Sequence, residues 1–161
     1  ASDVNGDGIT ELPRAVLMAG YKDTSSSDAV YMLDWYAYGI GKVPTKVATT
    51  YQNISDAWSL LIDQKWHDRI TAIKANDGGL SYVEFFEYRK NKMSIPLFNI
   101  YCATGSNREY YAERTDLIQL GQTTQAIYFA KLTNEGEQSE LALTGDEIKA
   151  RFSLVNQAWN N

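Results

Sequence analysis

The sequence predicts an α+β fold in which an antiparallel β-sheet is packed by a C-terminal helix and is preceded by a short all-β segment. Three observations favour this class. Runs of apolar and aromatic residues are separated by Asn, Asp and Gly turn signals. The 161 residues include 11 tyrosines and 4 tryptophans, which favour strands. The last segment has the apolar periodicity of an amphipathic helix.

The stretch from Asp3 to Glu11 has the spacing of a calcium-binding loop. The five expected oxygen ligands alternate along it: the side chains of Asp3, Asn5, Asp7 and Glu11, and the carbonyl of Ile9. Ca²⁺ binds roughly six to eight oxygens, and the intervening glycines provide the backbone angles that convergence on one centre needs. An EF-hand requires an acid at the twelfth position, where this chain has Arg14. The alternative is an Asn-Gly/Asp-Gly turn without metal.

Residues 3–13, with the sequence DVNGDGITELP, resemble the calcium loop of the FG-GAP/VCBS repeats. These repeats form β-propeller blades in integrin-like and bacterial surface proteins. The resemblance covers about residues 1–50 and implies a strand after the loop, which could include residues 16–18. A propeller needs several blades, and the sequence contains no second DxDxDG motif. We therefore expect residues 1–51 to be a propeller remnant with a structural Ca²⁺.

The remaining elements of this first part form a predicted hairpin. A strand is expected over residues 29–38, a turn over 39–42 and a second strand over 43–51. Trp35 in the first strand is expected to be a core residue. The composition and the spacing of the apolar runs change after residues 50–56. This change predicts a domain boundary near residue 52 and a second domain over 52–161.

The second part contains six predicted strands. They span residues 57–62, 70–75, 80–88, 95–103, 115–120 and 125–132. A turn with Trp66 follows the first, and Asn76 to Gly79 predict a hairpin after the second. Both faces of 80–88 and 95–103 are apolar, so both should be covered. A short helical turn is expected over 109–113 and a polar acidic loop over 134–140.

The last predicted element is a helix that begins after Thr144. Glu147 completes a capping box with this residue. One apolar stripe follows at helical spacing and should lie on the sheet: Ile148, Phe152, Val155 and Trp159.

The order of these elements over about residues 52–160 resembles the PsbP-like fold shared with the Ran-binding Mog proteins. The resemblance implies an antiparallel sheet between helical layers. A propeller tail followed by such a domain is similar to clostridial-type surface lipoproteins of unknown function. Members of the fold are mostly binding or assembly factors. The resemblance therefore implies a non-catalytic extracellular module with a protein or glycan partner, anchored to the bacterial cell membrane by a lipid outside this sequence.

Composition excludes several other classes of function. The net charge of −5 argues against nucleic-acid binding, and the basic cluster of residues 89–92 is expected to be a solvated turn. Cys102 and His67 are the single residues of their types, so an intramolecular disulfide is impossible and a Cys/His metal cage is disfavoured. Cys102 is expected to be a buried thiol. No window contains 18 consecutive apolar residues.

A hydrolase is the alternative function, with an unrecognised carboxylate/His site. Its acids would be Asp77, Glu84 and Glu87, and its base would be His67. Glu84 and Glu87 are three residues apart in a predicted strand and should point to opposite faces, which is poor geometry for a carboxylate pair.

A third hypothesis is the capture of carbohydrate or peptide by exposed tyrosines. Tyr110 and Tyr111 are adjacent and could form an aromatic platform. In a short helical turn, however, one of the two would normally face the core.

Overall fold

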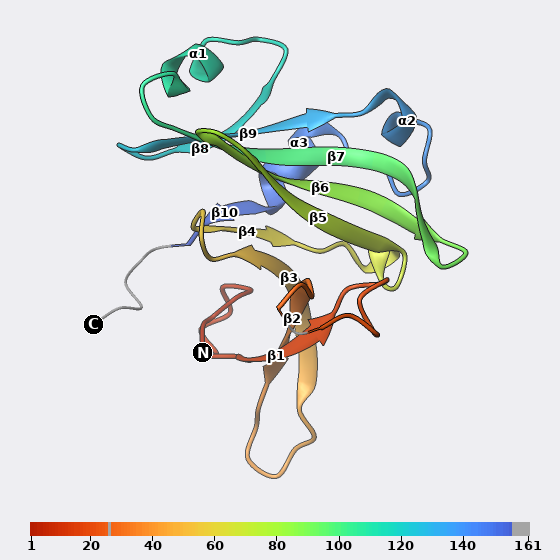
Figure 1. Cartoon of the computed structure of the whole chain (residues 1–161). Coiled ribbons are helices and arrows are strands. Elements are labelled where there is room, and N and C mark those ends of the chain that lie inside the picture. The colour runs from red at the N-terminus through yellow and green to blue at the C-terminus, as the bar shows by residue number, and fades with distance from the viewer. Residues whose placement is uncertain (26, 156–161) are drawn as a thin grey trace.

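Two antiparallel five-stranded sheets form the body of the protein in the computed structural model, which describes residues 1–25 and 27–155 (Figure 1). The first sheet has the order β1 (Leu12–Leu17), β2 (Tyr31–Ala37), β3 (Thr45–Asn53), β4 (Trp58–Leu61) and β10 (Phe152–Leu154). The second has the order β5 (Ile70–Asp77), β6 (Leu80–Arg89), β7 (Lys92–Thr104), β9 (Ala126–Leu132) and β8 (Ile118–Gln122). The short helices are η1 (Gln64–Trp66), α1 (Arg108–Ala112), α2 (Asn134–Glu137) and α3 (Gly145–Arg151). The sheet-rich arrangement is compatible with the predicted α+β class.

Tight turns explain why neighbouring strands pair in sequence order. Residues 78 and 79 join β5 to β6, as the Asn-Asp-Gly-Gly signal predicts. Lys90 and Asn91 join β6 to β7, and their φ angles of 53° and 62° are those of a primed hairpin turn. The basic cluster over residues 89–92 is therefore a turn, as expected. The predicted hairpin of β2 and β3 is also confirmed.

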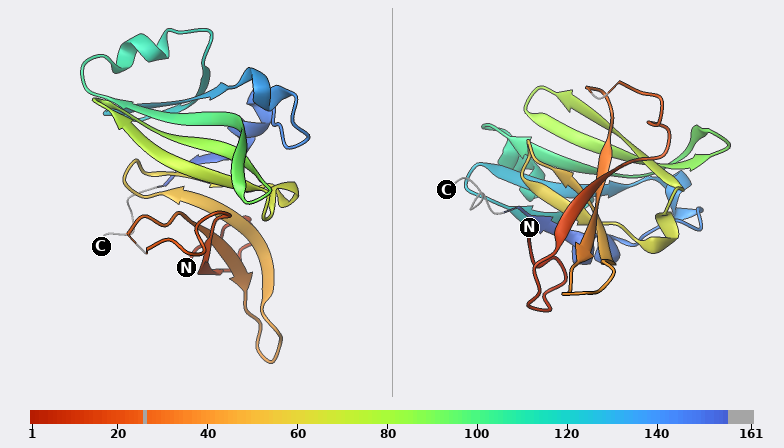
Figure 2. Two further views of the ribbon diagram at one scale, coloured as in Figure 1. Left: turned by 45° about the vertical axis from the view of Figure 1, so that its right-hand side comes forward. Right: turned by 90° about the horizontal axis from the view of Figure 1, so that it is seen from below.

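The main core lies between the two sheets, which are stacked face to face in Figure 2. Tyr51 of the first sheet contacts Phe85 of the second edge-on, with ring centroids 5.5 Å apart. Phe85 in turn stacks on Phe98, which packs against Trp66. These side chains are at most 1% exposed. Their burial supplies the main driving force for folding, at about 25 cal/mol per Å² of apolar surface.

Strand β3 runs through residue 52, where the sequence predicts a domain boundary. The first sheet continues across that point, because β3 pairs with β4. Buried residues from both sides of it, such as Met32 and Phe85, also belong to one core cluster. The backbone and the core thus show no interruption at residue 52. The division into 1–51 and 52–161 stays a prediction about the protein families to which the two parts are related.

The prediction for the C-terminal helix is right at its start and wrong at its end. The Thr144 side chain accepts a bond from Glu147 N, and the Glu147 side chain accepts one from Thr144 N, so the capping box is present. The helix ends at Arg151, and Phe152 opens strand β10 opposite Leu60. Pairing with β4 overrides the helical periodicity because it places the Phe152 ring on Trp58, with centroids 5.9 Å apart. The predicted stripe member Trp159 lies outside the described residues.

Two smaller predictions also need correction. Residues 134–137 form helix α2 rather than a loop, because the Thr133 side chain caps it by accepting a bond from Gly136 N. The face of β6 that points away from the core is only partly covered: Val83 and Phe85 are buried, whereas Tyr82 is half-buried. Among the described residues, no helix has the length and apolar character needed to cross a membrane.

Candidate metal centre

The acidic loop lies at the N-terminal end of the first sheet, immediately before β1 (Figure 1). Ser2 and Glu11 close it by exchanging two backbone hydrogen bonds, Ser2 N to Glu11 O at 3.1 Å and Glu11 N to Ser2 O at 2.8 Å. Because Leu12 follows directly in β1, the geometry of the loop is tied to the edge of the sheet.

Asp3 organises the loop through its carboxylate. Its Oδ1 accepts bonds from Gly6 N at 2.7 Å and from Asp7 N at 3.1 Å, and its Oδ2 accepts one from Gly8 N at 2.9 Å. Gly6 and Gly8 have φ angles of +76° and +83°, which side chains other than glycine rarely adopt. The two glycines of the motif therefore let the chain wrap around the Asp3 carboxylate.

Asn5 and Asp7 are linked to each other within the loop. Asn5 Nδ2 donates to Asp7 Oδ2 at 2.9 Å, and Asp7 N donates to Asn5 Oδ1 at 3.1 Å. The other Asp7 oxygen, Oδ1, accepts a bond from Ile9 N at 2.8 Å. These contacts hold both side chains in place. That the Asn5 and Ile9 oxygens are metal ligands stays a prediction.

Glu11 differs from the other acids because its side chain is fully buried, with 0% exposure. Its Oε2 accepts a bond from Val4 N at 2.8 Å. Its Oε1 is buried and has no hydrogen-bond partner among the described residues. A buried acceptor without a partner costs about 1–3 kcal/mol, and more when it is charged. This oxygen therefore needs a positively charged or hydrogen-bonding ligand.

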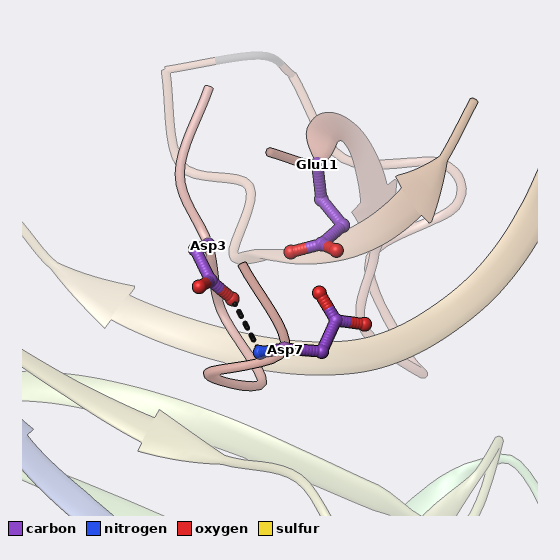
Figure 3. Close-up of side chains that lie close together, drawn as sticks. All are labelled: Asp3, Asp7 and Glu11. Atoms are coloured by element: carbon purple, nitrogen blue, oxygen red, sulfur yellow. Dashed lines mark hydrogen bonds between the residues drawn. The ribbon is translucent and has the colours of Figure 1, made fainter. Parts of the chain in front are cut away.

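Three carboxylates converge in the loop, as Figure 3 shows. Asp3, Asp7 and Glu11 each offer one oxygen, and these three oxygens lie within 4.8 Å of one another. Like charges at such distances repel. A divalent cation bound among these oxygens would remove this repulsion. Hard oxygen donors suit Ca²⁺, so the donor set fits the predicted metal.

The residues of the predicted hydrolase site lie in different surroundings. His67 has an exposed side chain, and its Nε2 is 3.4 Å from Asp68 Oδ2. Glu87 is 2% exposed on the core side of β6, where it pairs with Arg89 and accepts a bond from Ser139 Oγ at 2.9 Å. Glu84 alternates with it on the other face. The predicted opposite orientation of Glu84 and Glu87 is confirmed. Asp77 is the last residue of β5.

A groove of about 740 Å³ lies beside β3 and β4, and no sequence motif predicts it. Its lining comes from four segments: Met32, residues 46–49, residues 61–64 together with His67, and Arg151. Its cations are paired, with Lys46 Nζ 2.8 Å from Asp34 and Arg151 2.7 Å from Asp63. Residues distant in sequence form this groove, so no local motif could have predicted it.

The adjacent tyrosines of α1 point to different surroundings. Tyr111 stacks on Phe129 of β9, with ring centroids 5.1 Å apart. Tyr110 is 63% exposed, and the Arg114 guanidinium lies 5.7 Å from its ring centroid. One tyrosine thus covers the sheet and the other faces solvent, so the two rings do not form a common platform.

Comparison of the chain with protein-family models, with curated proteins and with solved structures found no match.

Proposed function

We propose that the chain is a non-catalytic extracellular binding or scaffold module of a bacterial surface lipoprotein, with a structural Ca²⁺ bound in the loop from Asp3 to Glu11. The observation that carries the metal proposal is the fully buried Glu11 carboxylate. Its Oε1 has no hydrogen-bond partner among the described residues, and one oxygen of this carboxylate lies within 4.8 Å of oxygens of Asp3 and Asp7. A folded loop of this kind is costly without a cation.

Calcium in this position stabilises the fold. Gathering three carboxylates within 4.8 Å raises the free energy of the folded chain, and a bound cation reverses that effect. Because the unfolded chain does not hold the ligands together, the binding free energy adds to the free energy of unfolding. The stabilisation acts on β1, since Glu11 both contributes a carboxylate and pairs with Ser2 one residue before the strand.

The kind of site supports the proposed location. Calcium modules of extracellular proteins commonly have dissociation constants of about 10⁻⁴–10⁻³ M. Asp3 and Asp7 are exposed, so this site suits such a weak, structural role. An extracellular lipoprotein would carry the module in calcium-rich surroundings.

Part of the strand order supports the proposed relationship of the first part. Strands β1 to β3 follow the loop as an antiparallel meander, as consecutive strands of a propeller blade do, whereas the fourth strand of this sheet, β4, belongs to the second part. Here β10 adds a fifth strand to that sheet. We propose that residues 1–51 derive from an FG-GAP/VCBS repeat and that residues 52–161 form a PsbP-like domain.

Thermal unfolding tests the calcium proposal. The metal-stripped protein should melt at a lower temperature in EDTA than in millimolar Ca²⁺, and Mg²⁺ should have a smaller effect because it demands a tighter octahedral site. Ca²⁺ at 100 times its Kd would add about 2.7 kcal/mol to the free energy of unfolding.

Two variants complete that experiment. Asp7→Ala should abolish the response to Ca²⁺, whereas Asp23→Ala, which removes an equal charge from an exposed loop position, should retain it. An unchanged melting temperature of the wild type on addition of Ca²⁺ would rule out the structural role. Surface labelling of intact cells with an antibody tests the location separately, and detection only in the cytoplasmic fraction would contradict it.

A further inference from the structure

The hairpin formed by β2 and β3 extends beyond the body of the protein in Figure 1 and in Figure 2. Its tip, residues 38–44, carries three exposed apolar side chains. Ile40 is fully exposed, Val43 is 85% exposed and Tyr38 is 55% exposed. Exposed apolar side chains that gather in one place commonly mark a contact with a partner. The hairpin tip thus has the character of a docking element.

The base of the same hairpin lines the groove of about 740 Å³ beside β3 and β4. Residues 46–49 of β3 line it from the hairpin, and residues 61–64 and His67 line it from the end of β4 and from η1. Val47, Leu61 and Ile62 give this lining an apolar part. One hairpin therefore carries an apolar tip at its end and borders a partly apolar groove at its base.

Strand β3 has a free edge along this groove. Towards the hairpin tip, its pairing with β4 ends where Ile62 N donates to Thr49 O at 2.8 Å. Among the described residues, 45–48 pair only with β2, so the backbone on their other side is open to a further strand. A lysine on an edge strand commonly blocks such pairing, but Lys46 is held 2.8 Å from Asp34. The groove can therefore accept an extended segment that continues the sheet beyond β4.

The free charges of the tip and of the groove have opposite sign. Residues 35–55 contain no Asp or Glu, although the chain has a net charge of −5, so the hairpin avoids the repulsion expected between two acidic surfaces. Lys42 in the tip is exposed and forms no ion pair with another described residue. At the groove, Asp68 is exposed, with its Oδ2 3.4 Å from His67 Nε2. A lysine from a second molecule can therefore approach Asp68.

We propose that two copies of this chain form a reciprocal dimer, in which the free β3 edges pair antiparallel and each hairpin tip packs into the groove of the other copy. Antiparallel pairing of a segment with the same segment of a second copy is two-fold symmetric, so it creates both contacts at once. Because the paired strands run in opposite directions, the tip of one copy is directed towards residues 61–64 of the other. There the apolar tip covers apolar groove residues, and Lys42 approaches Asp68.

A second copy is favoured over an unrelated partner because one surface of this chain supplies the tip, the groove and the edge between them. The assembly goes beyond the proposed function: neither contact involves the acidic loop, so the dimer does not depend on the proposed calcium role.

Sedimentation velocity of the whole chain over a dilution series tests this inference. The wild type should show a concentration-dependent equilibrium between monomer and dimer. The double variant Ile40→Ser/Val43→Ser changes only exposed positions, so it should fold normally but dimerise at least tenfold more weakly. Ile54→Ser makes the same change at a 73% exposed position outside the tip and the groove lining, and it should dimerise like the wild type.

A charge exchange tests whether the tip of one copy meets the groove of the other. Lys42→Glu and Asp68→Lys should each weaken dimerisation severalfold, because each places like charges opposite one another in the dimer. The variant that carries both changes should recover the dimer.

Three outcomes would overturn the proposal: the wild type stays monomeric up to submillimolar concentration, the Ile40→Ser/Val43→Ser variant dimerises as tightly as the wild type, or the charge exchange does not restore the dimer. Binding to vesicles that contain phosphatidylserine is measured in parallel. A monomeric wild type that binds these vesicles and loses the binding in Ile40→Ser/Val43→Ser would identify the tip as a membrane contact and likewise contradict the dimer.

Discussion

Ser2 and Glu11 form a two-residue antiparallel bridge, with N···O distances of 3.1 and 2.8 Å, that closes the acidic loop just before β1. The bridge fixes the backbone of Glu11, and Val4 N fixes one oxygen of its side chain. The second oxygen is buried without a hydrogen-bond partner among the described residues, and one oxygen of the carboxylate lies within 4.8 Å of oxygens of Asp3 and Asp7. A single residue therefore belongs both to the sheet edge and to the proposed calcium site.

Replacing Glu11 by glutamine should have opposite effects with and without calcium. Gln has the same shape but no charge, so Glu11→Gln relieves the repulsion from Asp3 and Asp7 and the burial of an unpaired charge. In EDTA the variant should be more stable than the wild type by about 1–3 kcal/mol. In millimolar Ca²⁺ it should be the less stable protein.

Urea unfolding of both proteins in the two buffers measures this reversal. Asp23→Asn, which neutralises an exposed acid, should show no such change of order. If Glu11→Gln destabilises the protein equally in EDTA and in Ca²⁺, Glu11 is a structural residue without a role toward metal.

Truncation of Phe152 tests the placement of the C-terminal segment in a strand. Phe152 is 9% exposed and contacts the rings of Trp58 and Tyr128. Phe152→Ala should lower the free energy of unfolding by about 3–5 kcal/mol. Leu154 lies on the same strand but is 36% exposed, so Leu154→Ala should cost less than about 1.5 kcal/mol. Equal losses in the two variants, measured by chemical denaturation, would contradict the register of β10.

Alkaline pH should destabilise the protein because a buried thiol and a partly buried tyrosine hydroxyl resist losing their protons. Burial, with a smaller effect of Asp56, raises the pKa of the Cys102 thiol from 9.0 to about 11, and burial raises the pKa of Tyr128 from 10.0 to about 12. Between about pH 9 and 12 the unfolded chain therefore binds fewer protons than the native chain, so the free energy of unfolding falls as pH rises.

Denaturation at pH 8, 9.5 and 11 measures this dependence. Cys102→Ala removes one of the groups and should give a shallower decline than the wild type. A wild-type free energy of unfolding that rises from pH 9 to 11 would contradict the assigned pKa shifts. The thiol should also react slowly with a thiol reagent at pH 8 in the native state, because it is 3% exposed.

The strands could be predicted because their signals are local. A strand is predicted from a run of apolar residues, and a turn from the few residues that form it. The hairpins around residues 78–79 and 90–91 confirm two turns that were predicted in this way. The end of the last helix could not be predicted. Phe152 fits the helical stripe begun by Ile148, and only the free edge of β4, which is distant in sequence, makes the strand more favourable.

The acidic loop shows the same division between local and distant information. Alternating oxygens and two glycines predict that Asp3 and Asp7 converge, because all the residues involved lie within one loop. The complete burial of Glu11 depends on packing against the folded sheet, which the motif does not encode. The aromatic row of Tyr82, Tyr101 and Phe129 likewise depends on the pairing of three strands.

The most direct test of the central claim is calorimetric titration of Ca²⁺ into the metal-stripped wild-type protein. Asp3, Asp7 and Glu11 form one cluster, so a single binding site per chain is expected, and it should be lost in Asp7→Ala but retained in Asp23→Ala. Absence of saturable binding at millimolar Ca²⁺, or equal binding by Asp7→Ala, would contradict the assignment of this loop as a calcium site.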